Sequence, residues 1–304
     1  ARLPALPEAP LTVAGPTGVR LWYLGARPRT LGASVAPVLV GTAVGVHYGE
    51  LIWWRALLCL VLAAALQIGV NYANDYSDGV RGVDRERKGP LRLTASGLVA
   101  PASVKRAAIL SFAVGAVAGL VLAVSVSLWL LVVGAASIAA AALYSGGPKP
   151  YASSGMGEVS VLVFFGFVAT CGSAFVQLER VPWLAVGASV PVGLLACAIL
   201  LVNNLRDIVS DTSSGKRTLA VRIGELRTVR LYQASVVASF AAVPGLALVA
   251  PGALLGLAAA PLALPPLKAV RVGASPPVLV ACLVATATMQ LAFSILLAAG
   301  LAWT

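Results

Sequence analysis

Forty-two consecutive residues, 107–148, contain no side chain that ionises apart from Tyr144. That length is enough for two bilayer crossings, because a membrane-spanning helix needs about 20 apolar residues. Hydrophobic residues make up 59% of the 304-residue chain and charged residues only 11%, whereas charged residues are about a quarter of an ordinary soluble domain. The sequence therefore predicts an all-α, polytopic membrane protein.

Nine apolar runs of helical length follow one another along the chain. They lie at about 31–48, 52–74, 104–124, 126–144, 156–177, 182–204, 229–249, 251–267 and 277–302. We expect the eighth run to be shortened or kinked, because Pro251, Pro261, Pro265 and Pro266 fall within it. Residues 1–20 are predicted to form a disordered segment outside the membrane. Residues 21–304 are predicted to form one domain of nine transmembrane helices around a central cavity.

The positive charges predict the orientation of these helices. If the helices alternate in direction, 20 of the 22 Lys and Arg residues fall on the side of the N-terminus, and only Arg55 and Arg180 fall on the other. Because cytoplasmic loops carry the excess of Lys and Arg, the N-terminus is expected in the cytoplasm and the C-terminus outside the cell membrane. This pattern accounts for the net charge of +11 without a nucleic-acid partner.

Most of the eleven acidic residues gather at the cytoplasmic ends of the second and sixth predicted helices. The first cluster has the sequence Asn-Asp-Tyr-Ser-Asp over 74–78, and the second has Arg-Asp-Ile-Val-Ser-Asp over 206–211. Each is part of a polar stripe on one helix face, because its members are spaced by three or four residues. The stripes are Gln67, Asn71, Asn74, Asp75 and Asp78, and Asn203, Asp207 and Asp211.

These stripes must face the interior of the bundle, because a carboxylate facing lipid would cost about 3 kcal/mol. We expect the two helices to lie side by side, with their acidic ends around one cavity. Crowded carboxylates repel one another unless a cation lies among them. Oxygen ligands favour Mg²⁺, and the absence of His and Cys from both motifs disfavours Zn²⁺. Neither segment has the order of an EF-hand calcium loop.

Basic residues follow each acidic motif along the chain. Magnesium held by acidic residues, with Lys and Arg contacting the remaining oxygens, is an arrangement that binds a diphosphate. A diphosphate site at the mouth of an apolar bundle indicates a substrate whose remainder is apolar, such as an isoprenoid diphosphate. About half of these basic residues, among them Arg85, Arg87 and Arg227, have an alternative role as ordinary cytoplasmic loop charges. The polar stripes also have an alternative role, in which they line a cation pathway in a transporter.

The two motifs resemble those of the UbiA superfamily of intramembrane prenyltransferases. Residues 74–78 are similar to its N-D-x-x-D pattern, and Asp207 to Asp211 to its D-x-x-x-D pattern, although the second motif here has only two aspartates. Shorter segments are most similar to the MenA branch of the superfamily, the 1,4-dihydroxy-2-naphthoate polyprenyltransferases. These segments lie at 74–84, 144–151, 157–159 and 215–221. That branch transfers a polyprenyl group from its diphosphate to the naphthoate with loss of CO2 and diphosphate, giving demethylmenaquinol in menaquinone biosynthesis.

The resemblance implies roles for individual residues. The expected Mg²⁺ ligands are Asp75, Asp78, Asp84, Asp207, Asp211 and Asn71. The expected diphosphate-binding residues are Lys216, Arg217, Arg206, Arg81, Lys88, Asn74 and Asn203. Tyr144 is expected to offer its ring face to an allylic cation, and Glu158 to position or deprotonate the acceptor. Two alternatives stay open, namely another acceptor of the same superfamily, such as 4-hydroxybenzoate, and an ion-coupled transporter.

Overall fold

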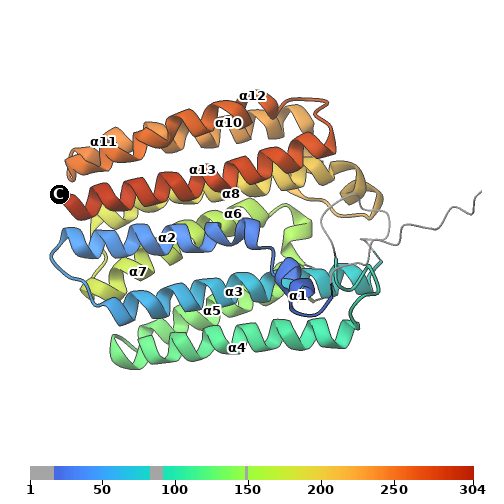
Figure 1. The fold of residues 1–304 in the computed structure, drawn as a ribbon, viewed down its shortest axis with the longest axis horizontal. Coiled ribbons are helices and arrows are strands. Elements are labelled where there is room, and N and C mark those ends of the chain that lie inside the picture. Colours follow the sequence, from blue (N-terminus) through green and yellow to red (C-terminus); the bar gives the residue numbers. More distant parts are fainter. Residues whose placement is uncertain (1–16, 83–91, 148–149) are drawn as a thin grey trace, which may run out of the picture.

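A computed structural model of the chain describes residues 17–82, 92–147 and 150–304. This part of the chain folds into helices joined by loops (Figure 1). In chain order the elements are α1 Val19–Gly25, α2 Pro28–His47, α3 Trp53–Val80, α4 Pro101–Ser125, α5 Trp129–Ser145, the 3-10 helix η1 Tyr151–Ser154, α6 Gly157–Val161, the π-helix η2 Leu162–Val168, α7 Ala169–Leu178, α8 Trp183–Ser213, α9 Leu219–Ile223, α10 Glu225–Ala241, α11 Val243–Ala247, the 3-10 helix η3 Pro251–Ala263, α12 Leu264–Ala269 and α13 Pro276–Trp303.

Each of the nine predicted spans coincides with a helical segment of the described residues. Seven of these segments are long and apolar enough to cross a membrane: α2, α3, α4, α6 to α7, α8, η3 to α12, and α13. The other two are shorter, because α5 has 17 residues and α10, also of 17 residues, is followed by the short helix α11. The all-α, multi-pass architecture is confirmed, and the count of nine applies to helical segments rather than to full-length spans.

Two segments differ in detail from the simple expectation. Helix α1 begins at Val19, two residues before the predicted domain boundary, and residues 1–16 lie outside the described part of the chain. The eighth segment is a 13-residue 3-10 helix over Pro251–Ala263 that continues into α12. Pro261 lies inside this 3-10 helix, and proline lacks the N–H that the α-helical ladder needs. The predicted shortening or kink of the segment stays a prediction.

Successive segments run in opposite directions, which sorts their ends into two groups (Figure 1). The loops after α2, α4, α7 and α11 lie at the same end as the C-terminus. The helix ends there carry Trp53, Trp129, Trp183 and Trp303, so we name it the Trp-rich end. The loops after α3, α5, α8 and α12 lie at the opposite end, which we name the basic end because these loops and the helix ends beside them carry most of the Lys and Arg residues.

The apolar side chains divide between a core and an outer surface. The main core lies around α8, α10, η3 and α13, where Leu195, Phe293 and Leu297 are fully buried. Large apolar side chains on the outer faces of the bundle, such as Val124 and Leu248, are exposed. An apolar outer surface on helices whose backbone groups are internally hydrogen-bonded suits hydrocarbon rather than water.

Glycines allow close approach between the helices, as their GxxxG spacing predicts. A Cβ placed on Gly41 would collide with the backbone of α7, and one on Gly45 would lie 2.7 Å from a side-chain carbon of Gln177. Gly115 and Gly119 face leucine side chains of α3 in the same way. These residues set the packing of α2 on α7 and of α4 on α3.

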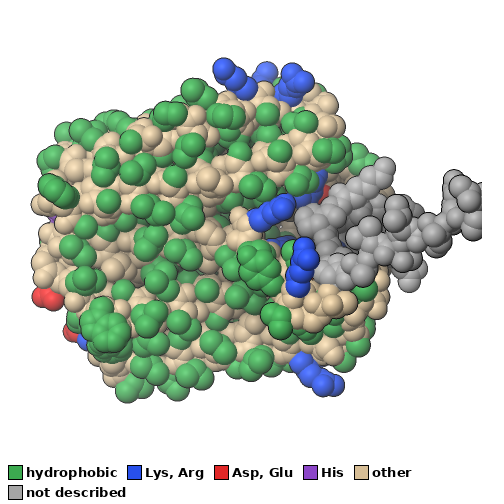
Figure 2. Space-filling model, in the orientation of Figure 1, with side chains coloured by type: hydrophobic (Ala, Val, Ile, Leu, Met, Phe, Trp, Pro, Cys, Tyr) green, Lys and Arg blue, Asp and Glu red, His purple; other side chains and the backbone are tan. Residues whose placement is uncertain are grey.

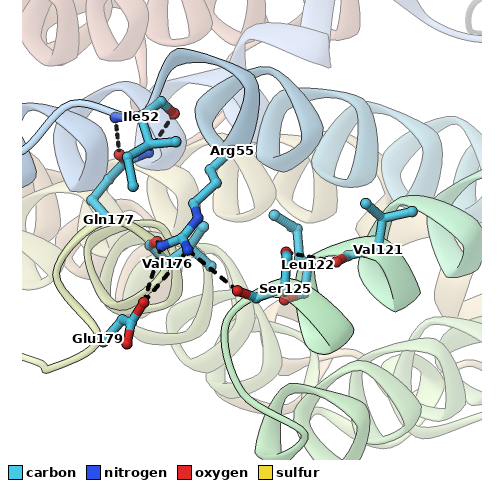
Figure 3. Close-up of polar contacts among 8 residues, drawn as sticks. All are labelled: Ile52, Arg55, Val121, Leu122, Ser125, Val176, Gln177 and Glu179. Carbon is cyan, nitrogen blue, oxygen red and sulfur yellow. Dashed lines mark hydrogen bonds and ion pairs between the residues drawn. The ribbon is translucent and has the colours of Figure 1, made fainter.

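At the Trp-rich end, Arg55 joins three helices (Figure 3). Its guanidinium donates to the carbonyl oxygen of Val176 at 2.9 Å and to that of Ser125 at 3.3 Å, and it forms an ion pair with Glu179 at 3.3 Å. Beside it, the Gln177 side chain accepts a hydrogen bond from the backbone N–H of Ile52 at 2.7 Å. These contacts fix the start of α3 to the ends of α4 and α7.

Candidate active site

The polar stripe of α3 runs along the inner face of the helix toward the basic end. Asn71, Asp75 and Asp78 are buried, while Gln67 and Asn74 are partly exposed to an internal cavity. Most other residues of α3 are apolar, and the helix packs mainly on α4, with further contacts to α2 and α5. The sequence prediction that this stripe avoids lipid is confirmed.

The stripe of α8 reaches the same end of the bundle. Asp207 and Asp211 are buried near the end of this 31-residue helix, and Asn203, one turn earlier, lines the cavity. The loop that follows turns back along the helix end, because the backbone N–H of Lys216 donates to the carbonyl oxygen of Asp211 at 2.8 Å. Because the C-terminal ends of α3 and α8 both lie at the basic end, the two stripes end at the same side of the molecule.

An ion pair connects the two helix ends. The Lys216 ammonium nitrogen lies 3.0 Å from Asp78 Oδ1, and it joins the loop after α8 to the last turn of α3. The bodies of the two helices, however, are not packed side by side as expected. Helix α3 packs mainly on α4, whereas α8 packs mainly on α10, α13 and η2, and α2 packs against both. The acidic ends converge across the cavity that α3 and α8 share.

The other aspartates have partners within the protein. Both carboxylate oxygens of Asp75 accept backbone N–H groups, from Leu93 and Thr94, each at 2.8 Å. Asp207 accepts two hydrogen bonds from Arg206, at 2.8 and 2.7 Å. Arg206 also donates to Asn203 at 2.8 Å. Among the described residues, no three acidic, His or Cys side chains lie together in a way that could hold a metal ion. This distribution is consistent with the repulsion between carboxylates, which favours a separate positive or N–H partner for each.

A cavity of about 620 Å³ lies inside the bundle. Helices α2 to α8 and α13 all contribute to its wall. Most of the lining is apolar and includes Phe164, Phe165 and Leu200. Most of the polar lining residues gather toward the basic end, namely Arg27, Thr30, Gln67, Asn71, Asn74, Tyr144, Tyr151, Ser160 and Asn203. Ser34, Ser137 and Ser173 line the cavity as well. The four aspartates lie behind this polar end rather than on the cavity wall.

Tyr144 lies at the polar end of the cavity, beside the start of α6, which carries Glu158. Tyr144 lines the cavity and packs edge-on against Tyr151, with ring centres 5.5 Å apart. Glu158 is buried at the start of α6, where its Oε1 accepts a hydrogen bond from Asn204 at 2.9 Å. Its Oε2 has no hydrogen-bond partner. Burial raises the pKa of Tyr151, against a smaller opposing effect of its hydrogen bond with Ser160, so this phenol stays neutral.

Several predicted residues lie elsewhere or have other contacts. Arg81 is exposed and donates to the carbonyl oxygen of Gly147. Arg217 is exposed, and its backbone N–H donates to the carbonyl oxygen of Ser153 at 2.9 Å. Asn71 donates to the carbonyl oxygen of Ala26 at 2.9 Å. Asp84 and Lys88 lie outside the described residues.

The structure adds three features that sequence reasoning missed. Arg27 lines the cavity, Asn204 holds Glu158, and the π-helix η2 contributes Phe164 and Phe165 to the cavity wall. Asn204 had a signal, because it adjoins Asn203 in a span that is otherwise apolar. The π-helix had no signal in the sequence, since its residues are those of an ordinary apolar span.

The chain was compared with known proteins and protein families. Residues 34–272 match the model described as the UbiA prenyltransferase family. The chain belongs to this family. Among curated UbiA relatives, a Mycobacterium tuberculosis protein named 1,4-dihydroxy-2-naphthoate octaprenyltransferase is 48% identical over 93% of this chain and 97% of its own length. A protein of Escherichia coli K12 with the same name is 40% identical over 69% of this chain and 71% of its own.

Solved structures of UbiA homologues share the fold. The structure of a homologue from Archaeoglobus fulgidus bound to GPP and Mg²⁺ aligns with a TM-score of 0.63 over 92% of this chain and 99% of that chain. The two sequences are 15% identical. Together with the apolar helices, membership of this family identifies the chain as a multi-pass membrane protein and a prenyltransferase.

Proposed function

We propose that this UbiA-family chain transfers a polyprenyl group from polyprenyl diphosphate to 1,4-dihydroxy-2-naphthoate, with release of CO2 and diphosphate. The observation that carries this proposal is the 48% identity, over nearly the whole of both chains, to a relative named for this naphthoate substrate. The product is demethylmenaquinol, the prenylated precursor in menaquinone biosynthesis. A long apolar cavity with one polar end suits a substrate made of a polyprenyl chain and a diphosphate.

The acidic residues of α3 and α8 are proposed to hold Mg²⁺ and, through it, the diphosphate. Their donor set fits this ion, because the carboxylates of Asp75, Asp78, Asp207 and Asp211 provide only oxygen atoms at one end of the bundle. Each oxygen of Asp75 that accepts one N–H keeps a second lone pair. Bound Mg²⁺ neutralises the diphosphate and stabilises the charge that develops on it as a leaving group.

The basic residues beside these carboxylates are proposed to bind the remaining diphosphate oxygens. Lys216 is the best placed, because its ammonium group already lies among the acidic residues at the side of Asp78. Asn74 and Asn203 face the cavity and supply amide groups at its polar end. Arg206 contributes by holding Asp207 and Asn203 in position.

The rest of the reaction is assigned to the cavity. As the carbon–oxygen bond breaks, both electrons leave with the diphosphate, and the apolar wall keeps water away from the allylic cation. Tyr144 is placed to face this cation. The ring carbon that bears the carboxylate then bonds to the allylic carbon, and the carboxylate leaves as CO2. Glu158, whose Oε2 has no protein partner, is the proposed acceptor of a hydroxyl proton or hydrogen bond from the naphthoate.

The basic end is proposed to face the cytoplasm. On the face shown in Figure 2, Lys and Arg side chains gather on the half of the molecule that carries α1, and acidic side chains are visible at the opposite end. Cytoplasmic loops carry such an excess of Lys and Arg. In this orientation the polar end of the cavity opens toward the soluble naphthoate, and the C-terminus of α13 lies outside.

The proposal is tested by the products of the purified, detergent-solubilised protein. It is supplied with Mg²⁺, polyprenyl diphosphates of several lengths and a mixture of acceptors that includes the naphthoate and 4-hydroxybenzoate. Mass spectrometry is expected to find prenylated naphthoquinol that has lost the mass of CO2. A prenylated 4-hydroxybenzoate as the main product, or no product together with ion flux in liposomes, would contradict the proposal.

A further inference from the structure

The end of α5 is joined to the end of α3 by three hydrogen bonds, which we name the α3–α5 junction. The Ser145 hydroxyl donates to Asn74 Oδ1. The Ser77 hydroxyl donates to the carbonyl oxygen of Ser145 at 2.7 Å, and Arg81 donates to that of Gly147. The three residues of the α3 side are spaced by three and four positions, so they lie on one side of the helix end.

Two of these bonds have a purely structural explanation. The last carbonyl groups of a helix lack partners within the helix, and Ser77 and Arg81 donate to carbonyl groups at and just beyond the end of α5. The bond from Ser145 differs, because it joins two side chains and one of them, Asn74, lines the cavity. Its role is therefore not explained by the helix end.

The bond from Ser145 determines which way the amide of Asn74 faces. The hydroxyl donates to the amide oxygen, so the NH2 group on the other side of the amide points away from Ser145. Among the described residues this nitrogen has no hydrogen-bond partner, although it carries two donors. Asn74 lies at the polar end of the cavity, so its N–H groups are available to a bound molecule there.

Asn203 has the same arrangement on the α8 side of the cavity. Its Oδ1 accepts an N–H of Arg206 at 2.8 Å. A guanidinium is only a donor, so this contact requires the amide oxygen of Asn203 to face Arg206. Two asparagines of the cavity wall, one from α3 and one from α8, thus have their oxygens held by donors of the protein. Their NH2 groups suit a molecule that only accepts hydrogen bonds.

We propose that Ser145 is a positioning residue, which holds the amide of Asn74 with its N–H groups toward the diphosphate. The oxygens of a fully ionised diphosphate only accept hydrogen bonds, so they would repel an amide oxygen that faced them. The Ser145 hydroxyl is the donor that allows Asn74 to turn its oxygen away. Asn74 is then a hydrogen-bond donor to the substrate rather than a ligand of Mg²⁺. The inference rests on the proposed function, which supplies a diphosphate at this end of the cavity.

The test measures binding of an unreactive substrate analogue. Geranylgeranyl thiolodiphosphate is titrated with Mg²⁺ into the full-length, detergent-solubilised protein, and its Kd is read by calorimetry. Asn74→Ala is expected to weaken binding about tenfold, and Ser145→Ala, which leaves the amide present but unoriented, about fivefold. The double variant is expected to bind no more weakly than Asn74→Ala, because Ser145 acts through Asn74. Ser145→Thr keeps the hydroxyl and is expected to stay within about twofold of the wild type.

Asn74→Asp tests which atom of the amide faces the substrate. This change replaces the NH2 group with a second oxygen and adds a negative charge. It is expected to weaken binding more than Asn74→Ala does, because the carboxylate repels the diphosphate. A carboxylate is also an ordinary Mg²⁺ ligand. Binding as tight as in the wild type would therefore mean that the oxygen of Asn74 faces the metal, and would overturn the inference.

Ser77→Ala is the matched control for a structural effect of the junction. It removes the neighbouring bond to Ser145 and leaves the contact with Asn74 in place. Its thermal midpoint is expected to fall at least as far as that of Ser145→Ala, with the Kd of the analogue unchanged. Equal weakening of binding in both variants, or none in Ser145→Ala, would show that Ser145 does not orient Asn74. Failure of the proposed function gives a different result, in which the wild type binds the analogue but forms no product from the naphthoate.

Discussion

The carboxylate of Asp75 has a structural use that can be measured apart from any role in metal binding. Its two oxygens accept the backbone N–H groups of Leu93 and Thr94, each at 2.8 Å, and Leu93 is fully buried. Asp75→Asn removes the charge and replaces one acceptor oxygen with an amide donor. A hydrogen bond to a charged group contributes about 1.5–3 kcal/mol, and a buried N–H left without an acceptor costs about 1–3 kcal/mol.

We therefore expect Asp75→Asn to make local opening of residues 92–94 easier by about 3 kcal/mol. Since every 1.4 kcal/mol is a factor of ten, the amides of Leu93 and Thr94 are expected to exchange about a hundredfold faster with deuterium. Hydrogen exchange read by mass spectrometry on peptides covering 92–100 measures this change. Asp78→Asn is the control on the same helix, because its carboxylate pairs with Lys216 instead. Exchange within about twofold of wild type in Asp75→Asn would refute the reasoning.

Three further predictions concern stability and substrate binding. Arg55→Gln removes a charged donor to a backbone carbonyl of α7 and is expected to destabilise the protein by about 2 kcal/mol. The thermal midpoint of this variant should fall by several degrees, whereas the control Arg180→Gln should change the midpoint little. Gly41→Ala places a Cβ against the backbone of α7 and is expected to cost about 1–3 kcal/mol in the same thermal assay, whereas Gly134→Ala, with nothing within 4 Å, should cost nothing. Lys216→Gln is expected to raise the KM for polyprenyl diphosphate about tenfold with little effect on the KM for the acceptor, and an equal rise in both would contradict the assignment.

The spans and the acidic ends of α3 and α8 could be predicted from the sequence because one simple cost governs both. Charged and polar groups avoid hydrocarbon, so uncharged runs mark the helices and three- or four-residue spacing marks their inner faces. The same rule placed Asp78 and Asp211 at one end of the bundle. The prolines of the segment over 251–267 predicted a shortened or kinked helix by a different rule, and the structure has a 3-10 helix, η3, over most of this segment.

The contacts of individual site residues could not be predicted in this way. Asp75 accepts N–H groups from a loop 18 residues away, and that pairing depends on how the loop folds. Arg206 donates to the carboxylate of the next residue, Asp207, and the sequence of α8 does not specify this pairing. Helices α3 and α8 lie across a cavity from each other because α3 packs mainly on α4, and α8 mainly on α10, α13 and η2. Packing of this kind depends on the shapes of several helices together.

The meeting of the acidic ends of α3 and α8 around one diphosphate is tested most directly by a double-variant cycle. Prenyl transfer to the naphthoate is measured at several Mg²⁺ concentrations for Asp78→Asn, Asp211→Asn and the double variant. Each single change is expected to lower kcat/KM by about 100-fold or more, and the double variant should be little worse than the poorer single one, because residues that act as a unit are not additive. A single variant that transfers the prenyl group at the wild-type rate, or two losses that multiply as if independent, would contradict a shared site.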